Sequence, residues 1–198
     1  MRVVLASTSR WRAQLLEQSG VRCEVLASGV DEGAFTEMDP TRRAEVLAVA
    51  KARAVAARLG DPSAVVIGAD QVAHLDGAVL HKPKTLERHR EQLHMLRGHS
   101  HTLVTGVCVL RAENEVVFHE TSSIHFRIDL SDEEIEDYLT TGEGRLACGG
   151  YQIEGLGPQL IDRVEGDWFN VVGLPVLRVV SELRALGWRP VYIPEVGR

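Results

Sequence analysis

The chain has 198 residues, of which 44% are hydrophobic and 25% are charged, with 22 Lys and Arg against 28 Asp and Glu. This composition is typical of a globular protein and excludes a disordered, collagen-like or disulfide-scaffold chain. The formal net charge of −6 argues against a nucleic-acid-binding protein, because such proteins usually carry a basic face. A small anionic ligand stays possible, since a few clustered Arg and Lys side chains suffice to bind one.

Cysteine spacing and hydropathy indicate the cellular compartment of the protein. Cys23, Cys108 and Cys148 show no C-x-x-C or Cys/His spacing, which favours a reduced, cytoplasmic protein. The apolar stretch Val3–Ala6 is too short for a signal peptide, and no window reaches the roughly 20 apolar residues of a membrane span. We therefore expect a soluble cytoplasmic protein with neither a membrane nor a nucleic-acid partner.

In chain order, strands alternate with helices and later pair as hairpins. The expected strands are 2–6, 22–27, 64–70, 103–110, 116–128, 151–154 and 160–164. The expected helices are 11–18, 40–60, 86–97, 132–141 and 175–186, with a polar loop at 31–39 and a hairpin turn at Asp76-Gly77. The N-caps are expected at Asp39, Thr85 and Ser131, the last in a capping box with Glu134. This order predicts one α/β domain over residues 1–198, with a mixed sheet flanked by helices.

Hydroxyl groups and a helix start meet in the segment Ser7-Thr8-Ser9-Arg10-Trp11-Arg12, directly after the first expected strand. The free N–H groups of a helix N-terminus attract anions, and Arg12 in the first turn suits a bound anion better than it suits the helix dipole. The alternative is equally open from this segment alone: a serine caps the helix and both arginines are solvated.

Asp70 ends the expected strand 64–70, where open α/β sheets place catalytic groups in a crevice and where a carboxylate can act as a general base. The alternative is an Asp that starts a turn and binds nearby backbone amides. Glu32 with Asp70 would offer two hard oxygens to Mg²⁺. Lys51 and Lys82-Pro83-Lys84 would suit phosphate oxygens, although each lysine also fits a solvent-facing position.

The glycine-rich segment 149–157 is a third candidate. Paired glycines allow a ligand to approach the backbone, Tyr151 can stack, and Glu154 can accept a hydrogen bond from the edge of a base. The alternative is a series of turns. The histidines show no zinc spacing, and we interpret His99 and His101 as exposed or structural.

Together these segments resemble the Maf family of nucleoside triphosphate pyrophosphatases. The matching blocks occur in family order at 5–16 (LASTSxxRxxLL), 30–32, 50–52, 68–71, 82–83, 105–106, 149–157 and 172–175. The resemblance implies an enzyme, often a homodimer, that hydrolyses a nucleoside triphosphate to the monophosphate and diphosphate with Mg²⁺ or Mn²⁺. It also implies a Maf/ITPase-like fold, in which a mixed twisted sheet and its helices form two lobes around a central cleft.

The resemblance also implies roles for individual residues. Asp70 is expected to accept the proton of the attacking water and, with Glu32, to bind the metal. The residues expected to bind the phosphates are Ser7, Arg12, Lys51 and Lys82.

Three positions at which the family branches differ are expected to select the base: Trp11, Gln71 and Glu154. The branch resembling a 7-methyl-GTP pyrophosphatase has this Trp, Gln and Glu, whereas the dTTP/UTP branch tends to Arg, Thr and Gln. A methylated guanine carries a positive ring that the indole would attract and that Glu154 would offset. We therefore expect a modified nucleotide such as 7-methyl-GTP, with a dTTP/UTP preference as the alternative.

Two departures from the family pattern bear on this expectation. Arg10 stands where the family usually has Pro, which predicts a less rigid loop or an added phosphate contact. Ala147-Cys148 replaces the Lys-Ala of the dTTP/UTP branch and removes a cation. Other functions that we weigh are a non-enzymatic nucleotide-binding regulator of septum formation and an inosine-triphosphate-type pyrophosphatase, which lacks the pattern of the first loop.

Overall fold

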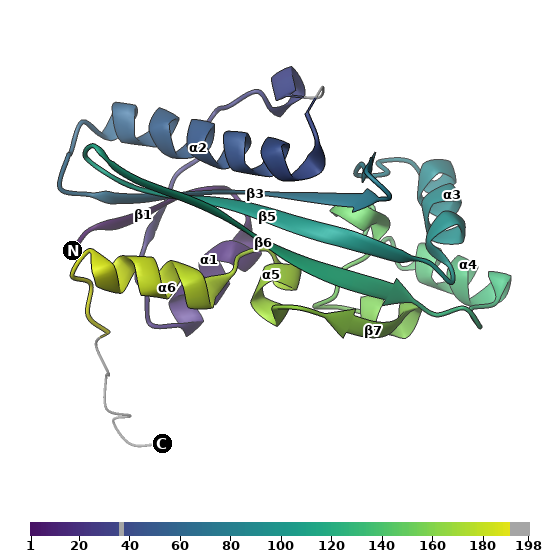
Figure 1. Ribbon diagram of the computed structural model, residues 1–198. Coiled ribbons are helices and arrows are strands. Elements are labelled where there is room, and N and C mark those ends of the chain that lie inside the picture. The colour runs from purple at the N-terminus through teal and green to yellow at the C-terminus, as the bar shows by residue number, and fades with distance from the viewer. Residues whose placement is uncertain (36–37, 191–198) are drawn as a thin grey trace, which may run out of the picture.

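In the computed structural model, which describes residues 1–35 and 38–190, seven strands form one long mixed sheet (Figure 1). They are β1 Val3–Ala6, β2 Glu24–Val25, β3 Val65–Leu75, β4 Ala78–Leu80, β5 Ser100–Arg111, β6 Asn114–Phe126 and β7 Ile161–Glu165. Their spatial order is β2–β1–β3–β5–β6–β7, and β4 pairs with the last part of β3. β1 is parallel to β2 and β3, whereas the other pairs are antiparallel.

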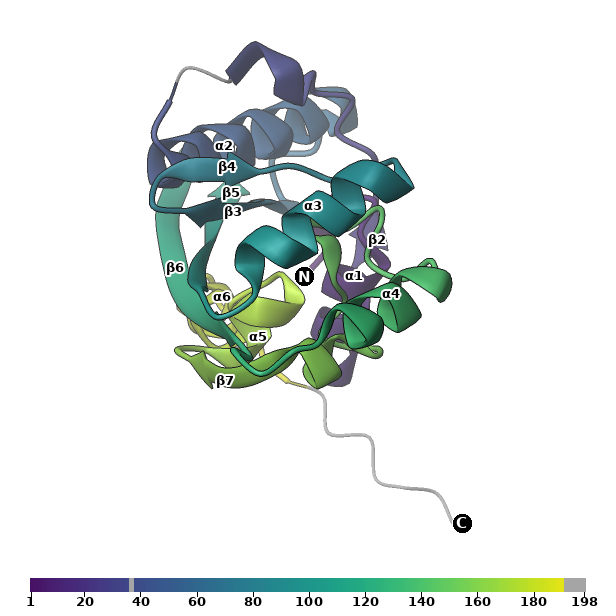
Figure 2. The same cartoon turned by 90° about the vertical axis from the view of Figure 1, so that its right-hand side faces the viewer.

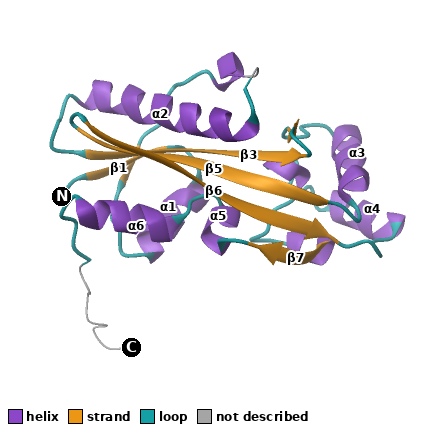
Figure 3. Ribbon diagram, in the orientation of Figure 1, coloured by secondary structure: helices purple, strands orange, loops and turns teal. Residues whose placement is uncertain are grey.

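Helices cover both faces of this sheet (Figure 3). They are α1 Arg10–Gln18, α2 Pro40–Leu59, α3 Leu86–Leu96, α4 Asp132–Thr140, α5 Trp168–Val172 and α6 Val176–Ala185, with short 3₁₀ helices at Glu32–Phe35, Cys148–Gly150 and Gly157–Leu160. α2 packs along one face, and α1, α5 and α6 pack against the other. α3 and α4 pack side by side at one end of the sheet (Figure 2).

The longest helix, α2, has the termination signals expected from the sequence. Asp39 caps it by accepting hydrogen bonds from the backbone N–H groups of Thr41 and Arg42, and Pro40 occupies the first turn. Gly60 ends the helix in a left-handed conformation with φ +59°. These local signals place the start of α2 beside the 3₁₀ helix that carries Glu32.

Small residues allow α2 to lie unusually close to the sheet. A Cβ at Gly68 would be 2.1 Å from the carbonyl oxygen of Ala48, and one at Gly106 would be 2.3 Å from the carbonyl carbon of Ala44. Ala44 and Ala48 are one turn apart and fully buried, so they form a flat stripe on the helix. The helix backbone therefore contacts the strands directly, which brings Lys51, further along α2, close to β3.

The apolar core is divided between the two ends of the sheet. One cluster joins β1, β3 and β5 to α1 and α6 and includes Leu5, Leu16, Ile67, Val107, Val179 and Leu183. The other joins the opposite end of the sheet to α3 and α4 and includes Leu93, Leu96, Leu103, Ile124, Ile135 and Leu139. Each fully buried aliphatic side chain of this kind contributes roughly 1.5–3 kcal/mol. This division confirms the expected α/β class with two lobes.

Most expected elements are present with shifted ends, and three expectations were wrong. Residues 151–154 form no strand, because Gly149 and Gly150 turn the backbone at φ +86° and +79° just before them. The strand at 22–27 is reduced to β2. β3 does not end at Asp70 but continues to Leu75, since β5 pairs with it as far as His74.

Some short elements had no sequence signal. α5 and the 3₁₀ helices are too short to show a helical period. The hairpin turn at Asp76-Gly77 is confirmed, with φ +49° and +86° as a two-residue turn between β3 and β4 requires. Across the described part of the chain, no helix is both long and apolar enough to cross a membrane.

Candidate active site

The candidate site lies at a gap along one edge of β3. On this edge the ladder with β1 ends at the pair Ala6–Gly68, and the ladder with β4 begins at Ala73–Leu80. Residues 69–72 between them face no other described strand there, although β5 pairs with their opposite edge. A cavity of about 1040 Å³ opens at this gap, lined from both lobes. Asp70 therefore lies mid-strand, at the level where its neighbour β1 ends.

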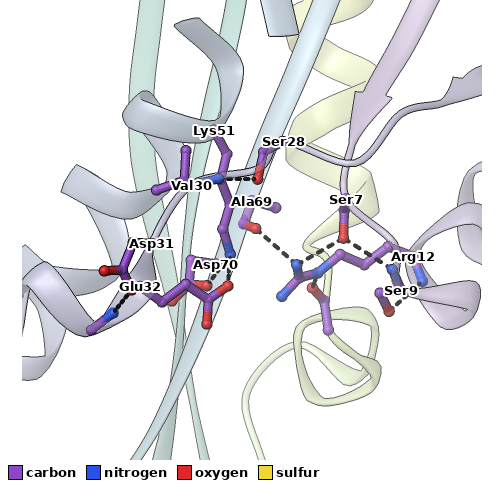
Figure 4. A network of polar contacts seen from close by, with 12 residues as sticks. Ser7, Ser9, Arg12, Ser28, Val30, Asp31, Glu32, Lys51, Ala69 and Asp70 are labelled. Atoms are coloured by element: carbon purple, nitrogen blue, oxygen red, sulfur yellow. Dashed lines mark hydrogen bonds and ion pairs between the residues drawn. The ribbon is translucent and has the colours of Figure 1, made fainter. Parts of the chain in front are cut away.

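Asp70 belongs to a network of three charged side chains (Figure 4). The ammonium of Lys51, on α2, donates to Oδ1 of Asp70 at 2.6 Å and to Oε1 of Glu32 at 2.5 Å. The side chains of Lys51 and Asp70 are only 8% and 12% exposed, whereas that of Glu32 is 54% exposed. The two carboxylates thus face one buried cation, and Oδ2 of Asp70 binds no other described residue.

The charges around Glu32 keep it ionised. Burial raises its pKa, but the hydrogen bond and charge of Lys51 outweigh that effect, and the charges of Lys82 and Arg12 act in the same direction as Lys51. The pKa of Glu32 therefore lies below its usual value. The same cations reach this carboxylate from α1, α2 and the loop after β4, so these segments surround one small volume.

Arg12 is held by the protein in a fixed orientation. Its Nε donates to the carbonyl of Gly173 at 2.8 Å, and its Nη1 donates to the carbonyl of Ala69 at 2.8 Å and to Oγ of Ser7 at 3.3 Å (Figure 4). Burial lowers the pKa of Arg12 while the carboxylates of Asp70 and Glu32 raise it, and an arginine stays protonated in proteins. Nη2 makes no hydrogen bond within the described residues, which leaves two N–H groups for an anion.

The start of α1 contains one part of the alternative interpretation: a serine caps the helix, but Arg12 is bound to the protein instead of being solvated. Ser9 is the N-cap, since its hydroxyl accepts from the backbone N–H of Arg12. Ser7 is buried and its hydroxyl accepts from the backbone N–H of Ser9 at 3.2 Å. Ser9 therefore caps the helix, Ser7 binds Arg12, and both serines line the cavity.

Arg10 contacts one of the residues that were predicted to select the base. Its guanidinium lies over the indole of Trp11, 4.3 Å from the ring centroid. Burial raises the pKa of Glu154, and the charge of Arg10 partly counteracts this rise. Within the described residues, Arg10 packs on Trp11, and its charge acts on Glu154. The added phosphate contact stays a prediction.

Gln71 lines the cavity, and both hydrogens of its side-chain amide are used within the protein. Its amide nitrogen donates to the carbonyl of Asn170 at 2.7 Å and to Oγ1 of Thr105 at 3.1 Å. A carbonyl accepts only, so these partners fix which end of the amide is nitrogen. Both amide hydrogens are used, and the side-chain oxygen of Gln71 remains as a hydrogen-bond acceptor in the cavity.

The structure brings every predicted site residue to this one cavity: Ser7, Trp11, Arg12, Glu32, Lys51, Asp70, Gln71, Lys82 and Glu154. Seven Arg and Lys side chains line it against three carboxylates, although the whole chain carries a net charge of −6. The cavity is therefore a basic region in an acidic protein, which suits a polyanionic ligand.

Two lining cations were missed from the sequence, Arg43 and Arg88. Arg43 lies eight residues before Lys51 on α2, so helical periodicity would place both near one face. Its Nε is buried and has no hydrogen-bond partner within the described residues. Arg88 lies in the first turn of α3, where its charge opposes the helix dipole, the same signal that identified Arg12.

The donor set for a metal consists of the carboxylates of Glu32 and Asp70. Within residues 1–35 and 38–190, no group of three His, Cys, Asp or Glu side chains converges to hold a metal ion alone. Two hard carboxylates without a complete protein cage fit Mg²⁺ or Mn²⁺, because such ions take their remaining ligands from water and substrate phosphates.

Comparison with solved structures gives matches that bear on the fold. The Ham1 protein of Staphylococcus aureus matches with a TM-score of 0.52 and 14% identity, and the match covers 93% of this chain and 100% of that one. At this identity the likeness concerns the fold alone. It agrees with the expected mixed α/β architecture.

Sequence comparisons define the family. The family model described as Maf-like protein matches residues 2–186. A protein named dTTP/UTP pyrophosphatase from a Geobacillus strain is 42% identical over 186 residues, which cover 94% of this chain and 98% of that protein. Proteins of the same name from Deinococcus radiodurans and Pyrococcus furiosus are 43% and 39% identical, over 94% of this chain and 93% and 95% of their own length. This chain therefore belongs to the Maf family.

Proposed function

We propose that this protein hydrolyses nucleoside triphosphates to the monophosphate and diphosphate, and that it prefers UTP and dTTP. The observation that carries the proposal is the convergence, in one basic cavity, of a buried carboxylate with a free oxygen and of cations fixed in place. Relatives of about 40% identity are named dTTP/UTP pyrophosphatase, which supports both the reaction and the choice of base.

Asp70 is the proposed proton acceptor. Lys51 binds Oδ1, so Oδ2 is free to accept a proton from a water molecule. The water oxygen then forms a bond to the α-phosphorus, and the bond from this phosphorus to the bridging oxygen breaks. The diphosphate leaves with the electron pair of that bond, and its charge is stabilised by the surrounding cations. General base catalysis of this kind typically contributes about 10²–10⁴-fold.

The remaining charged groups bind and orient the phosphates. Arg12 offers its free Nη2 from a guanidinium that three other contacts hold still, and little conformational freedom is lost when an anion binds. Lys82, with Arg43 and Arg88, adds positive charge along the cavity. A divalent metal at Glu32 and Asp70 would supply further charge neutralisation on the phosphate oxygens.

The base-facing residues support a neutral base with an N–H donor. The free oxygen of Gln71 accepts, and uracil and thymine offer the N3–H group that cytosine lacks. The relatives' names give no support to the expected preference for 7-methyl-GTP. Arg10 offers a physical reason, because its guanidinium already occupies the indole face that was expected to attract a cationic base.

A nucleotide panel tests the proposal. The protein is incubated with UTP, dTTP, CTP, ITP, GTP or 7-methyl-GTP and with Mg²⁺ or Mn²⁺, and the release of diphosphate and monophosphate is followed with and without a chelator. We expect the highest kcat/KM for UTP and dTTP and no turnover after chelation. Binding without diphosphate release from any nucleotide would favour the non-enzymatic regulator instead. The highest kcat/KM for 7-methyl-GTP would overturn the proposed base preference. The expected homodimer stays a prediction.

A further inference from the structure

One wall of the cavity is formed by residues 148–154, which contain only a short 3₁₀ helix at Cys148–Gly150. Cys148, Tyr151, Gln152, Ile153 and Glu154 of this segment line the cavity. A Cβ at Gly149 would lie 2.8 Å from Cε1 of the Tyr151 ring, and both Gly149 and Gly150 have positive φ. The glycine conformations therefore give the wall a defined backbone shape, although its residues belong to no described strand.

Three consecutive residues of this wall are held from behind by three different elements. The carbonyl of Gly150 accepts a hydrogen bond from Nε2 of His89, on α3. The hydroxyl of Tyr151 is hydrogen-bonded to Nε2 of His101, on β5, at 2.9 Å. The backbone N–H of Gln152 donates to the hydroxyl of Tyr138, on α4, at 3.2 Å.

The side chains that hold the wall are locked by packing. His89 and His101 are only 1% and 2% exposed, and Tyr138 is buried as well. The ring of His101 packs edge-to-face on Tyr151 and on Phe126, with centroids 5.5 and 5.7 Å apart, and His89 packs in the same way on Tyr138. Burial and edge-to-face packing restrict the rotation of these rings, which favours the observed hydrogen bonds.

Both histidines are neutral, which suits this role. Burial lowers the pKa of His89, and it lowers the pKa of His101 to about 4, with the nearby His74 and His125 acting in the same direction. The Gly150 carbonyl can only accept, so the proton of the His89 ring lies on Nε2. Nδ1 of His101 is buried without a partner among the described residues, and a doubly protonated ring there would bury an unpaired N–H.

None of the three holding side chains lines the cavity. They contact the wall from α3, β5 and α4, while Glu154, two residues after Gln152, lines the cavity. From this arrangement we infer that His89, His101 and Tyr138 are positioning residues that fix the wall 148–154 and thereby set the base selectivity of the enzyme. The inference rests on the proposed function, since it concerns the choice among nucleoside triphosphates.

The test uses Tyr151→Phe, which keeps the ring and removes the hydroxyl, and the pair His101→Gln and His101→Leu. Losing a hydrogen bond of this kind typically weakens an arrangement by about 0.5–1.5 kcal/mol, which corresponds to roughly two- to tenfold. We expect KM for the preferred nucleotide to rise by this factor in Tyr151→Phe and His101→Leu. We also expect kcat to change less than twofold and the ratio of kcat/KM between preferred and poor nucleotides to fall. His101→Gln retains a side-chain amide in reach of Tyr151 and is expected to rescue most of the effect.

Two controls separate positioning from packing. Phe126→Leu disturbs the same aromatic cluster without removing a hydrogen bond, and His99→Gln changes an exposed neighbour. Thermal unfolding of each variant and calorimetric binding of the monophosphate product measure folding and affinity independently of turnover. Because Tyr151 and His101 share one bond, the double variant Tyr151→Phe/His101→Leu should lose no more affinity than the larger single loss.

The outcomes distinguish the inference from the function on which it rests. A wild-type protein that hydrolyses no triphosphate refutes the proposed function. An active wild type whose Tyr151→Phe and His101→Leu variants keep their KM and selectivity refutes the inference alone. The inference is also overturned if Phe126→Leu shifts selectivity as much as these variants do, because packing would then be the cause.

Discussion

The two sides of the cavity are built in different ways. On the phosphate side, Lys51, Asp70 and Arg12 project from a long helix, a central strand and a capped helix, and each is fixed by direct ion pairs or by hydrogen bonds to backbone carbonyls. On the base side, Glu154 belongs to a loop whose shape depends on buried groups behind it. From this comparison we infer that the proposed chemistry depends on paired charges within the cavity, whereas the proposed selectivity depends on packing behind its wall.

The strongest test of the phosphate side is Asp70→Asn. The amide keeps the shape of the carboxylate but cannot accept the proton of water, so we expect kcat to fall by about 10²–10⁴-fold while the protein still folds. Diphosphate release and circular dichroism measure the two effects. Asp76→Asn is the matched control, since Asp76 lies in the exposed turn after the same strand, at a φ that Asn tolerates. Turnover close to that of the wild type would remove Asp70 from the mechanism.

Lys51→Met tests whether the paired charges on this side also stabilise the fold. Met fills the space of the aliphatic stem but leaves Asp70 and Glu32 without the cation that is hydrogen-bonded to both of them. Removing one partner of such a pair costs on the order of 3 kcal/mol. We expect the variant to have a lower Tm than the wild type. We also expect Mg²⁺ to raise the Tm of the variant more than that of the wild type, because a divalent ion would replace the lost charge. Lys84→Met, at an exposed position, is the control and should leave Tm nearly unchanged.

We infer that the base side of the cavity depends on His101, a buried neutral histidine. The free energy of unfolding of the protein should therefore depend on pH. The pKa of His101 is about 4 in the folded protein against 6.5 for an ordinary histidine, and the unfolded chain therefore binds more protons between these values. The contribution of neutral His101 to the free energy of unfolding is complete above pH 6.5. This contribution is lost as the pH falls towards 4, by on the order of 3 kcal/mol. Chemical denaturation at several pH values should show a shallower pH dependence in His101→Gln. If the free energy of unfolding changes equally with pH in the wild type and in His101→Gln, the assignment of a lowered pKa to His101 is contradicted.

The difference between the phosphate side and the base side of the cavity also explains which parts of the site the sequence predicts. Asp70, Lys51, Glu32 and Arg12 belong to local patterns with a chemical meaning, and the structure places them around one cavity. The fold class followed from the order of strands and helices. The position of Asp70 within its strand did not follow, because the gap beside it is created by the end of β1 and the start of β4. A strand's own pattern carries no information about where its neighbours stop.

The base side was harder to predict because its determinants are distant in sequence. The pairing of His101 with Tyr151 joins residues 50 positions apart, and nothing near His101 indicates that its ring is buried rather than exposed. Arg10 and Trp11 are adjacent, yet the sequence suggested a free indole face for a cationic base. In the structure Arg10 stacks on that face, a contact that no pattern in the sequence indicated.

Arg10→Ala gives the smallest expected effect and the finest test of the base side. A cation over an exposed aromatic ring contributes about 0.5–1 kcal/mol, so removing it should leave kcat/KM for UTP within about fivefold of the wild type. The indole face becomes free, and the kcat/KM for 7-methyl-GTP relative to that for UTP should rise by a similar factor. Arg22→Ala, which lies outside the cavity lining, is the control. If the ratio does not move, Arg10 is not what keeps a cationic base from Trp11, and the discrimination must come from Gln71 and the wall that carries Glu154.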